Sequence, residues 1–532
     1  MEKNAIILAA GKSGSFAPFT YEKPKGLFNV KGEILIERQI RQLKEAGIKD
    51  IYVVVGYMKE KYFYLENKFG VKLIVNNKFG KYGNLYSLYV ARDKICNTYI
   101  CCADHYYMEN PFTDVNADNI SYRACSYFEG KFREFGVTCS DMDVITDMSV
   151  GGSDSWAMVG YAYMNKSFSV KFCEFMNQEI NNFGVASMFW EEFYAKHIKD
   201  LTFYRKEYEQ GKIVEFESIE DLRKFDSEFL LNVDSDIISN ICSVLKCNPN
   251  DIVDINVINA GLTNVSFSFY ANDIKYVYRH PGSTAGNLIE RKSECFAQMK
   301  AKEYGLDKSV IYLDEMGWKI SYYVEDARCC DFENDDEQLN TAMSYLHRLH
   351  DIDINNEVRI FDNVEEGKKL MRIASLTKGN LEREFGEEVE KIEQLYEYVK
   401  LDSRKMGKKL VLCHNDVYAP NYLIDKSGNI YLIDWEYAGL NYEANDIGCI
   451  LCRHDWTNEQ IERYIENYLG HVPSEDEKRY YYAFIAISGF YWFCWGLYKG
   501  SVGDDDGFFF LPAYHNMKKY LDESLKRYRK LG

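Results

Sequence analysis

The stretch Leu410–Tyr437, LVLCHNDVYAPNYLIDKSGNIYLIDWEY, decides the fold of the second half of the chain. It predicts an apolar strand, a polar loop, and two short strands joined by the turn KSGN. His414, Asp416 and Asn421 stand in the loop, and Asp434 ends the last strand. These groups can move a proton or supply oxygen ligands to a metal. The stretch therefore predicts a catalytic site at the ends of these strands.

His414-x-Asp416, followed by Asn421 and Asp434, resembles the catalytic set of the kinase fold. The resemblance implies that Asp416 accepts the proton of a substrate hydroxyl, while Asn421 and Asp434 hold Mg²⁺ against the phosphates of ATP. Asp-Trp-Glu stands where protein kinases have Asp-Phe-Gly, and no Ala-Pro-Glu follows. This pattern is similar to that of choline and aminoglycoside kinases, which implies a small-molecule substrate.

The segment before this stretch resembles the nucleotide-binding lobe of the same kinases. In KYVYRHPG, Arg279 takes the place of the phosphate-binding strand lysine, and Glu294 on the following predicted helix is expected to orient it. The hinge that meets adenine is expected near Tyr323 to Glu325. A loop that covers the nucleotide is predicted in INAGLTNVSFSF, with three residues at its turn: Gly261, Thr263 and Asn264.

SGFYWFCWGLYKG places Trp492 and Trp495 three residues apart, hence on one face of a helix. A buried aromatic helix gives the same pattern. The pair follows the catalytic core, where choline kinases carry two tryptophans that embrace trimethylammonium, and aromatic faces suit such a cation. The resemblance implies choline rather than ethanolamine as substrate. The residues expected to complete this pocket are Glu436, Tyr437, Tyr442 and Asp446.

LAAGKSGSFAPFTYEKPKG, residues 8–26, follows a predicted buried strand. It is not a P-loop, because Ile6 stands where that motif requires glycine. It resembles the nucleotidyltransferase signature of an Ala-Ala-Gly loop, Pro-x-Thr and Pro-Lys. Lys25 is expected to neutralise phosphate charge. The small residues that let backbone amides approach a triphosphate are Ala9, Ala10 and Gly11.

One position departs from that signature. Ser15 stands where the family carries an arginine on the phosphates, and Ser13 where a second glycine is usual. Loss of one such contact costs roughly 2–4 kcal/mol in the transition state, by analogy with other preorganised donors. Lys12 and Lys23 are the nearby cations available to compensate. The departure leaves open a non-catalytic nucleotide- or phosphocholine-binding domain.

GKIVEFESIEDLRKFD resembles the closing motif of bacterial CTP:phosphocholine cytidylyltransferases. Glu215 and Glu217 are expected to share one face of a strand. Together with Asp104, after the strand TYICCAD, they are predicted to hold Mg²⁺ near the α-phosphate of CTP.

Other segments also fit that family. Asn84 and Ser87 suit recognition of the base and ribose. The residues expected to form the wall and counter-charge of a phosphocholine pocket are Trp156, Trp190 and Glu191; a core position is equally compatible with Trp156.

The 532 residues predict a multidomain α/β and α+β protein. Strands alternating with helices predict a mostly parallel sheet, hence a Rossmann-like nucleotidyltransferase domain, over 1–231. A two-lobed, protein-kinase-like choline kinase domain is predicted over 232–532, with lobes at about 232–328 and 329–532. Formal charge −18 argues against a nucleic-acid partner. No signal-peptide pattern or membrane-spanning run is present, so we expect a cytoplasmic location without membrane insertion.

The two resemblances imply consecutive reactions. A kinase converts choline and ATP to phosphocholine, and a cytidylyltransferase converts phosphocholine and CTP to CDP-choline and pyrophosphate. The alternatives are an active kinase beside a non-catalytic first domain, and an equivalent pair acting on ethanolamine, aminoethylphosphonate or a sugar phosphate. The sequence makes no prediction of the oligomeric state.

Overall fold

The computed structural model describes residues 2–113, 119–258, 264–281, 289–354, 358–503 and 507–530. The chain folds into two compact units, Met1–Val257 and Ile258–Gly532, and the division falls at the end of β12 (Val253–Ile258). The sequence predicted the junction about 25 residues earlier, near residue 232.

Polar interactions explain why the segment after the predicted junction stays with the first unit. Lys23 Nζ donates to the main-chain oxygen of Val233 at 2.8 Å. Glu22 accepts a 2.5 Å hydrogen bond from Ser235 Oγ, beside the N-terminus of α10 (Asp236–Leu245). Helix α10 is therefore part of the first unit, whereas the sequence placed its residues in the second domain.

The main sheet of the first unit is mixed. Its parallel part is β5-β4-β1-β6, and the hairpin of β8 and β9 extends it with antiparallel pairing. In spatial order the strands are β10 (Tyr204–Tyr208), β8 (Tyr122–Cys139), β9 (Ile145–Met164), β6 (Thr98–Cys102), β1 (Asn4–Ala9), β4 (Asp50–Val55) and β5 (Lys72–Val75).

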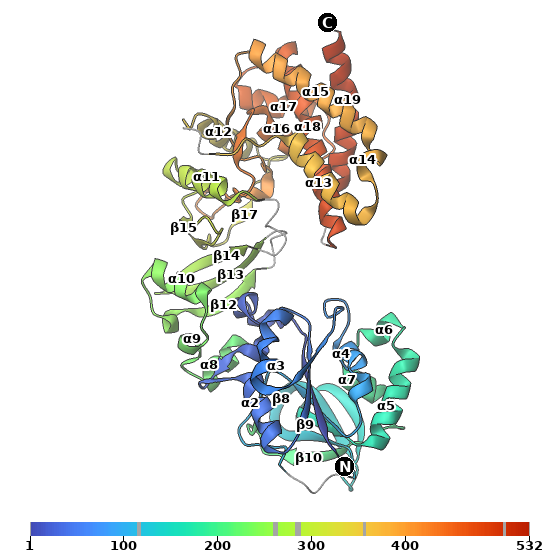
Figure 1. Cartoon of the computed structure of the whole chain (residues 1–532). Helices are drawn as coiled ribbons and strands as arrows, with labels where there is room; N and C mark the ends of the chain where they lie inside the picture. Colours follow the sequence, from blue (N-terminus) through green and yellow to red (C-terminus); the bar gives the residue numbers. More distant parts are fainter. Residues whose placement is uncertain are drawn as a thin grey trace. The chain divides into compact units, whose positions relative to one another are not determined.

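Both faces of this sheet are buried. Along β1, Ile6 and Leu8 belong to one apolar cluster, and Ala5 and Ile7 to another. This alternation follows from the two-residue period of a strand, and cover on both faces explains its continuous apolar run. Helices on the first face are α4 (Asn84–Val90), α5 (Lys166–Glu179) and α7 (Trp190–Lys196); on the second they are α2 (Leu35–Glu45) and α3 (Tyr64–Phe69) (Figure 1).

Shorter elements surround this core. A two-stranded pair joins β7 (His105–Tyr107) to β11 (Ile213–Glu215) at the carboxyl end of β6. The remaining elements of the unit are α1 (Phe19–Glu22), β2 (Asn29–Val30), β3 (Glu33–Ile34), α6 (Phe183–Ala186), α8 (Ile219–Phe225) and α9 (Phe229–Asn232).

The second unit begins with an antiparallel sheet and one helix. In this sheet β13, β14, β16 and β15 are neighbours in that order. Their bounds, with those of the helix α11, are β13 (Asn264–Ala271), β14 (Ile274–Pro281), β16 (Lys319–Tyr322), β15 (Val310–Leu313) and α11 (Arg291–Glu303).

The rest of the second unit is mainly helical, with small two- and three-stranded sheets. The strands are β17 (Arg328–Cys329), β18 (Val411–Cys413), β19 (Tyr422–Ile424), β20 (Ile430–Leu432) and β21 (Gly439–Asn441). The helices are α12 (Asp336–His350), α13 (Asn363–Lys378), α14 (Leu381–Glu384), α15 (Gly386–Lys405), α16 (Ala444–Leu451), α17 (Asn458–Leu469), α18 (Glu475–Ser501) and α19 (Phe510–Arg529).

The long helix α18 is buried over nearly its whole length, between α13, α16 and α19. This position explains why its sequence is apolar all round rather than on one stripe. Within the described residues, no helix combines the length and apolar character needed to cross a membrane.

Candidate active sites

The predicted catalytic loop of the second unit runs between β18 and β19. Asp416 is 7% exposed, and Asn421 Nδ2 donates to both its main-chain oxygen (2.8 Å) and its Oδ2 (3.2 Å). Burial raises the pKa of Asp416, and the charges of Arg453 and His414 oppose part of that increase. The loop therefore presents a fixed carboxylate with increased basicity, as proton abstraction requires.

Asp446 binds the backbone of this loop through hydrogen bonds. It is fully buried, and its carboxylate accepts hydrogen bonds from the backbone N–H groups of His414 (3.0 Å) and Asn415 (2.7 Å). We expected Asp446 in the substrate pocket. Asp446 does not line the cavity. Its place in α16 instead lets its carboxylate bind the backbone of the predicted catalytic loop.

Asn415 is a positioning residue that sequence reasoning missed. Its φ of 62° lies in the left-handed region, and its Oδ1 accepts hydrogen bonds from the side chains of Asn441 and Asn445. These bonds offset the cost of that backbone conformation. Asn-x-x-x-Asn spacing in NYEAN is the only trace of this network in the sequence, and it is too common to be diagnostic.

Arg279, Glu294 and Asp434 form a chain of charges across β14, α11 and the end of β20. Arg279 Nη2 pairs with Glu294, which is fully buried, and Arg279 Nη1 lies 3.8 Å from Asp434 Oδ1. Although burial acts to raise the pKa of Glu294, Arg279 and Arg291 lower it below its usual value. The guanidinium is thereby held at the cavity that Asp416 also lines.

This cavity has a volume of about 550 Å³ and brings most of the predicted kinase residues together. Its charged lining includes Lys319, the cross-strand partner of Arg279, which sequence reasoning missed. Tyr442 is not in the lining and packs against Phe484. Predicted residues that line the cavity are Arg279, Tyr323, Asp416, Asn421, Asp434, Glu436, Tyr437, Trp492 and Trp495.

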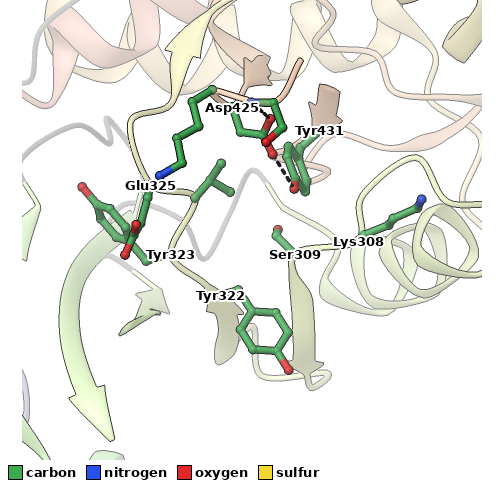
Figure 2. A pocket seen from close by; sticks show the side chains of 10 residues that line it. Lys308, Ser309, Tyr322, Tyr323, Glu325, Asp425 and Tyr431 are labelled. Atoms are coloured by element: carbon green, nitrogen blue, oxygen red, sulfur yellow. Dashed lines mark hydrogen bonds between the residues drawn. The ribbon is translucent and has the colours of Figure 1, made fainter. Parts of the chain in front are cut away.

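The predicted hinge borders a second hollow of about 350 Å³ (Figure 2). Tyr323 lines both hollows, whereas Glu325 lines only this one. The backbone N–H of Tyr323 donates to Lys275 O at 3.0 Å, so it is not free for adenine. Adenine contacts are therefore expected from neighbouring hinge groups. Gly261 and Thr263 lie outside the described residues, and Asn264 begins β13, without a described side chain.

The aromatic pair is buried and shared between the cavity and the helix core. Trp492 and Trp495 are each 2% exposed, with ring centroids 5.9 Å apart. Trp495 Nε1 donates to Tyr437 OH at 2.8 Å. The two interpretations that the sequence left open are compatible here, because these rings belong to the core of α18 and also line the cavity.

Activity of the second unit is expected to fall as the pH decreases, at a pH above the ordinary aspartate pKa of about 4. Asp416 can act as a base only when its carboxylate is ionised. Because burial raises the pKa of Asp416, the carboxylate becomes protonated, and activity is lost, at a higher pH than for an exposed aspartate. A profile of kcat/KM against pH measures this limb in the free enzyme. A limb at or below pH 4 would contradict a buried Asp416 as the base.

In the first unit, Lys25 and Asp104 form the centre of the predicted site. Lys25 is 6% exposed, and its Nζ donates to Asp104 Oδ2 at 2.9 Å and to the main-chain oxygen of Phe216. Burial acts to raise the pKa of Asp104, but Lys25 and His105 outweigh it and bring the pKa to about 2. Asp104 is therefore ionised throughout the neutral range.

Glu215 joins this centre, whereas Glu217 does not share its strand. Glu215 pairs with His105 across β11 and β7, with Oε2 3.1 Å from Nε2. The strand ends at Glu215, so the expected alternation onto Glu217 is wrong. Glu217 lies 3.6 Å from the exposed Arg133 instead. Ligand atoms of Asp104, His105 and Cys102 lie within 4.8 Å of one another.

The oxygen donors of both units fit Mg²⁺. Carboxylates of Asp104 and Glu215 in the first unit, and the carboxylate and amide of Asp434 and Asn421 in the second, are the hard ligands that this ion prefers. Cys102 is a poor magnesium ligand, and burial raises the pKa of its thiol well above the usual value. In the first unit the fit to Mg²⁺ therefore rests on the carboxylates of Asp104 and Glu215 rather than on Cys102.

Asn84 and Ser87 are committed to contacts within the first unit. Asn84 Oδ1 accepts a hydrogen bond from the backbone N–H of Trp190 (2.8 Å), and Ser87 Oγ accepts one from Asn76 Nδ2 (3.0 Å). A Cβ on Gly83 would lie 2.2 Å from Met188 O. The segment KYGNLYSL thus joins α4 to the start of α7, which provides a structural reason for these residues beside the predicted recognition of base and ribose.

The predicted phosphocholine wall is partly occupied by the chain's own cations. Arg205 lies over the ring of Trp156 at 4.2 Å, and Arg123 lies 5.5 Å from the ring of Trp190. Burial raises the pKa of Glu191 to about 7, although the charge of Arg123 opposes this. The ionisation of Glu191, the predicted counter-charge, therefore changes near neutral pH.

The loop after β1 is open. A Cβ on Gly11 would meet nothing within 4 Å, so space for a ligand adjoins it. Ser13 has a φ of 48°, a conformation that favours glycine and accounts for the glycine usual at this position. Ser15 is exposed. Lys23 donates to Val233 O and Asp234 O at 2.8 Å each, which leaves Lys12 as the nearby cation to compensate.

Both sites have the charged groups of nucleotide-dependent transferases, and comparison with known proteins agrees. The family described as choline/ethanolamine kinase matches residues 255–521, and that described as a MobA-like NTP transferase domain matches residues 5–120. Over 228 residues the chain is 33% identical to the choline-phosphate cytidylyltransferase of Streptococcus pneumoniae, covering 43% of this chain and 98% of that protein.

The chain is also similar to two further proteins. The 2-aminoethylphosphonate cytidylyltransferase of Lancefieldella rimae is 32% identical over 239 residues, covering 43% of this chain and 93% of that protein. The crystal structure of the choline kinase LicA from Streptococcus pneumoniae is 21% identical, with a TM-score of 0.44, covering 54% of this chain and 98% of that one.

The chain belongs to the choline/ethanolamine kinase family through its second half and to the choline-phosphate cytidylyltransferase family through its first. It is a fusion of a Rossmann-like nucleotidyltransferase domain and a choline-kinase-like domain, as the sequence predicted.

Proposed function

We propose that the chain makes CDP-choline in two steps. The second unit phosphorylates choline with ATP, and the first transfers a cytidylyl group from CTP to phosphocholine, releasing pyrophosphate. The observation that carries the proposal is the cavity in which the carboxylate of Asp416, the charge pair of Arg279 and Glu294, and the rings of Trp492 and Trp495 lie together. The proposed setting is cytoplasmic, with Mg²⁺ required by both steps.

In the proposed kinase step, Asp416 accepts the proton of the choline hydroxyl, whose oxygen attacks the γ-phosphorus of ATP, and ADP leaves. Arg279 binds phosphate oxygens and is kept in place by Glu294. Asn421 and Asp434 would hold Mg²⁺, which neutralises phosphate charge when bound. Trp492, Trp495 and Tyr437 provide aromatic surface, and Glu436 negative charge, for the ammonium group.

In the proposed cytidylyl step, a phosphate oxygen of phosphocholine attacks the α-phosphorus of CTP and pyrophosphate leaves. Lys25 stabilises the charge that develops on the phosphates, and the backbone of Ala9, Ala10 and Gly11 cradles them. Asp104 and Glu215 would hold Mg²⁺, which acts as a Lewis acid when bound. Burial of Lys25 strengthens its interaction with that charge.

Two coupled assays test the proposal. The wild type is expected to release pyrophosphate from CTP when Mg²⁺ and phosphocholine are present, well above an Asp104→Ala variant. ADP formation across choline, ethanolamine, an aminoglycoside and a sugar identifies the kinase substrate, and choline is expected to give the highest kcat/KM. Pyrophosphate release no greater than that of the variant would refute the two-enzyme proposal.

Ser15 supports a second candidate, an active kinase joined to a non-catalytic nucleotide- or phosphocholine-binding unit. It is exposed beside the open loop and carries no positive charge. The resemblance to a 2-aminoethylphosphonate enzyme supports a related candidate with a primary-amine substrate. Pyrophosphate release with phosphocholine, phosphoethanolamine and 2-aminoethylphosphonate in parallel separates these candidates.

A further inference from the structure

The amine pocket of the second unit already contains a cation of its own. The guanidinium carbon of Arg453 lies 4.0 Å from the ring centroid of Trp492, 4.3 Å from that of Tyr418 and 5.0 Å from that of Phe509. Arg453 Nη2 pairs with Asp416 Oδ1 at 2.5 Å. Aromatic faces and one carboxylate are the groups that recognise a quaternary ammonium ion, and here they surround a guanidinium.

The Arg453 side chain is buried, yet its hydrogen bonding is incomplete. It is 1% exposed and lines the cavity, but its Nε and Nη1 have no hydrogen-bond partner among the described residues. Unmet donors of a buried charged group cost free energy. Arg453 therefore lies over the ring of Trp492 with two of its hydrogen-bond donors unpaired.

The backbone on either side of Arg453 is fixed. Asn516 Nδ2, from α19, donates to the main-chain oxygens of Cys452 (3.1 Å) and His454 (2.8 Å). Any change at this position therefore takes place by rotation of the long side chain. Such rotations are fast compared with backbone rearrangement.

We propose that Arg453 occupies the ammonium position of the kinase site and has to leave the face of Trp492 before a cationic substrate binds there. Two cations on one ring face, beside one carboxylate, repel each other in a poorly solvated cavity. Arg453 thus sets how tightly the pocket binds an amine, because it raises the apparent Kd for every cation by the reciprocal of the fraction of molecules in which the guanidinium has left this position. This inference rests on the proposed kinase function.

The first test replaces Arg453 with methionine, which keeps length and apolar volume. KM for choline is expected to fall about tenfold if the guanidinium is in place in about nine molecules of ten. A KM that is unchanged or raised would overturn the proposal and make Arg453 a residue that only positions Asp416.

The matched control is Arg479→Met. Arg479 is also buried, pairs with Asp402 at 2.9 Å and lies 5.2 Å from the ring of Tyr528, but does not line the cavity. It is expected to leave KM for choline unchanged. A fall in KM equal to that of Arg453→Met would overturn the proposal, because it would show a general effect of losing a buried arginine.

The second test needs no turnover. Calorimetry with methylguanidinium is expected to detect binding to an Arg453→Ala chain, competitive with choline, and at least tenfold weaker binding to the wild type, whose own guanidinium holds the place. Equal binding to both chains, or none to the variant, would overturn the inference. Absence of choline-dependent ADP formation by the wild type would instead refute the proposed function, and the calorimetric comparison remains decisive.

Discussion

Replacing Asp416 with asparagine is expected to lower choline-dependent ADP formation by about 10²- to 10⁴-fold, the usual contribution of a general base. The variant keeps the shape of the side chain, so Asn421 and Arg453 retain neighbours of the same size. What it loses is the carboxylate that accepts the hydroxyl proton. We therefore expect kcat to fall far more than KM for ATP changes.

Asp402→Asn is the matched control for this change. Asp402 is another buried carboxylate paired with an arginine, Arg479, and it does not line the cavity. This control is expected to lower stability while keeping kcat within a few-fold of the wild type. Steady-state ADP formation and thermal unfolding, measured on both variants, separate catalysis from folding. Equal losses of kcat would refute Asp416 as the base.

The site residues that could be predicted from the sequence are those that lie close together along the chain in a recognisable pattern. His414, Asp416 and Asn421 lie within eight consecutive residues, and Asp434 follows at the end of a hairpin whose turn is explicit in KSGN. The strand predicted before residues 8–26 and the strand predicted in TYICCAD likewise form, as β1 and β6, because buried parallel strands read as continuous apolar runs. In these cases the local sequence pattern was sufficient to predict the element or the site residue.

The groups that were missed or misplaced depend on contacts between distant segments. Arg453 lies 37 residues after Asp416, and only the packing of α16, α18 and α19 brings it onto Trp492. Asp446 was placed in the pocket because acid type and sequence position do not reveal which way a buried helix faces. The antiparallel hairpin of β8 and β9 turned the expected mostly parallel sheet into a mixed one.

The second large effect is expected at Lys25. Lys25→Met is predicted to lower phosphocholine-dependent pyrophosphate release by about 10²- to 10³-fold, the range seen when one preorganised donor to a developing charge is lost. The effect is large because Ser15 and the bonded Lys23 leave few cations at this loop. Choline-dependent ADP formation by the same chain is expected to stay near the wild-type rate, because that site lies in the other unit. Thermal unfolding of the variant measures whether the first unit is still folded.

Loss of Lys25 also removes the cation that lowers the pKa of Asp104, so a fall in activity has two sources. Asp104→Asn separates them, because it removes the carboxylate charge and keeps a side chain of the same size beside Lys25. Lys68→Met, which breaks the pair of a lysine with the buried Glu37, is the matched control and is expected to keep pyrophosphate release near the wild-type rate.

If Lys25→Met and Lys68→Met lose activity equally, Lys25 stabilises the unit rather than the transition state. If Lys25→Met releases pyrophosphate at the wild-type rate, another cation neutralises the phosphate charge. Lys12 is then the next residue to replace.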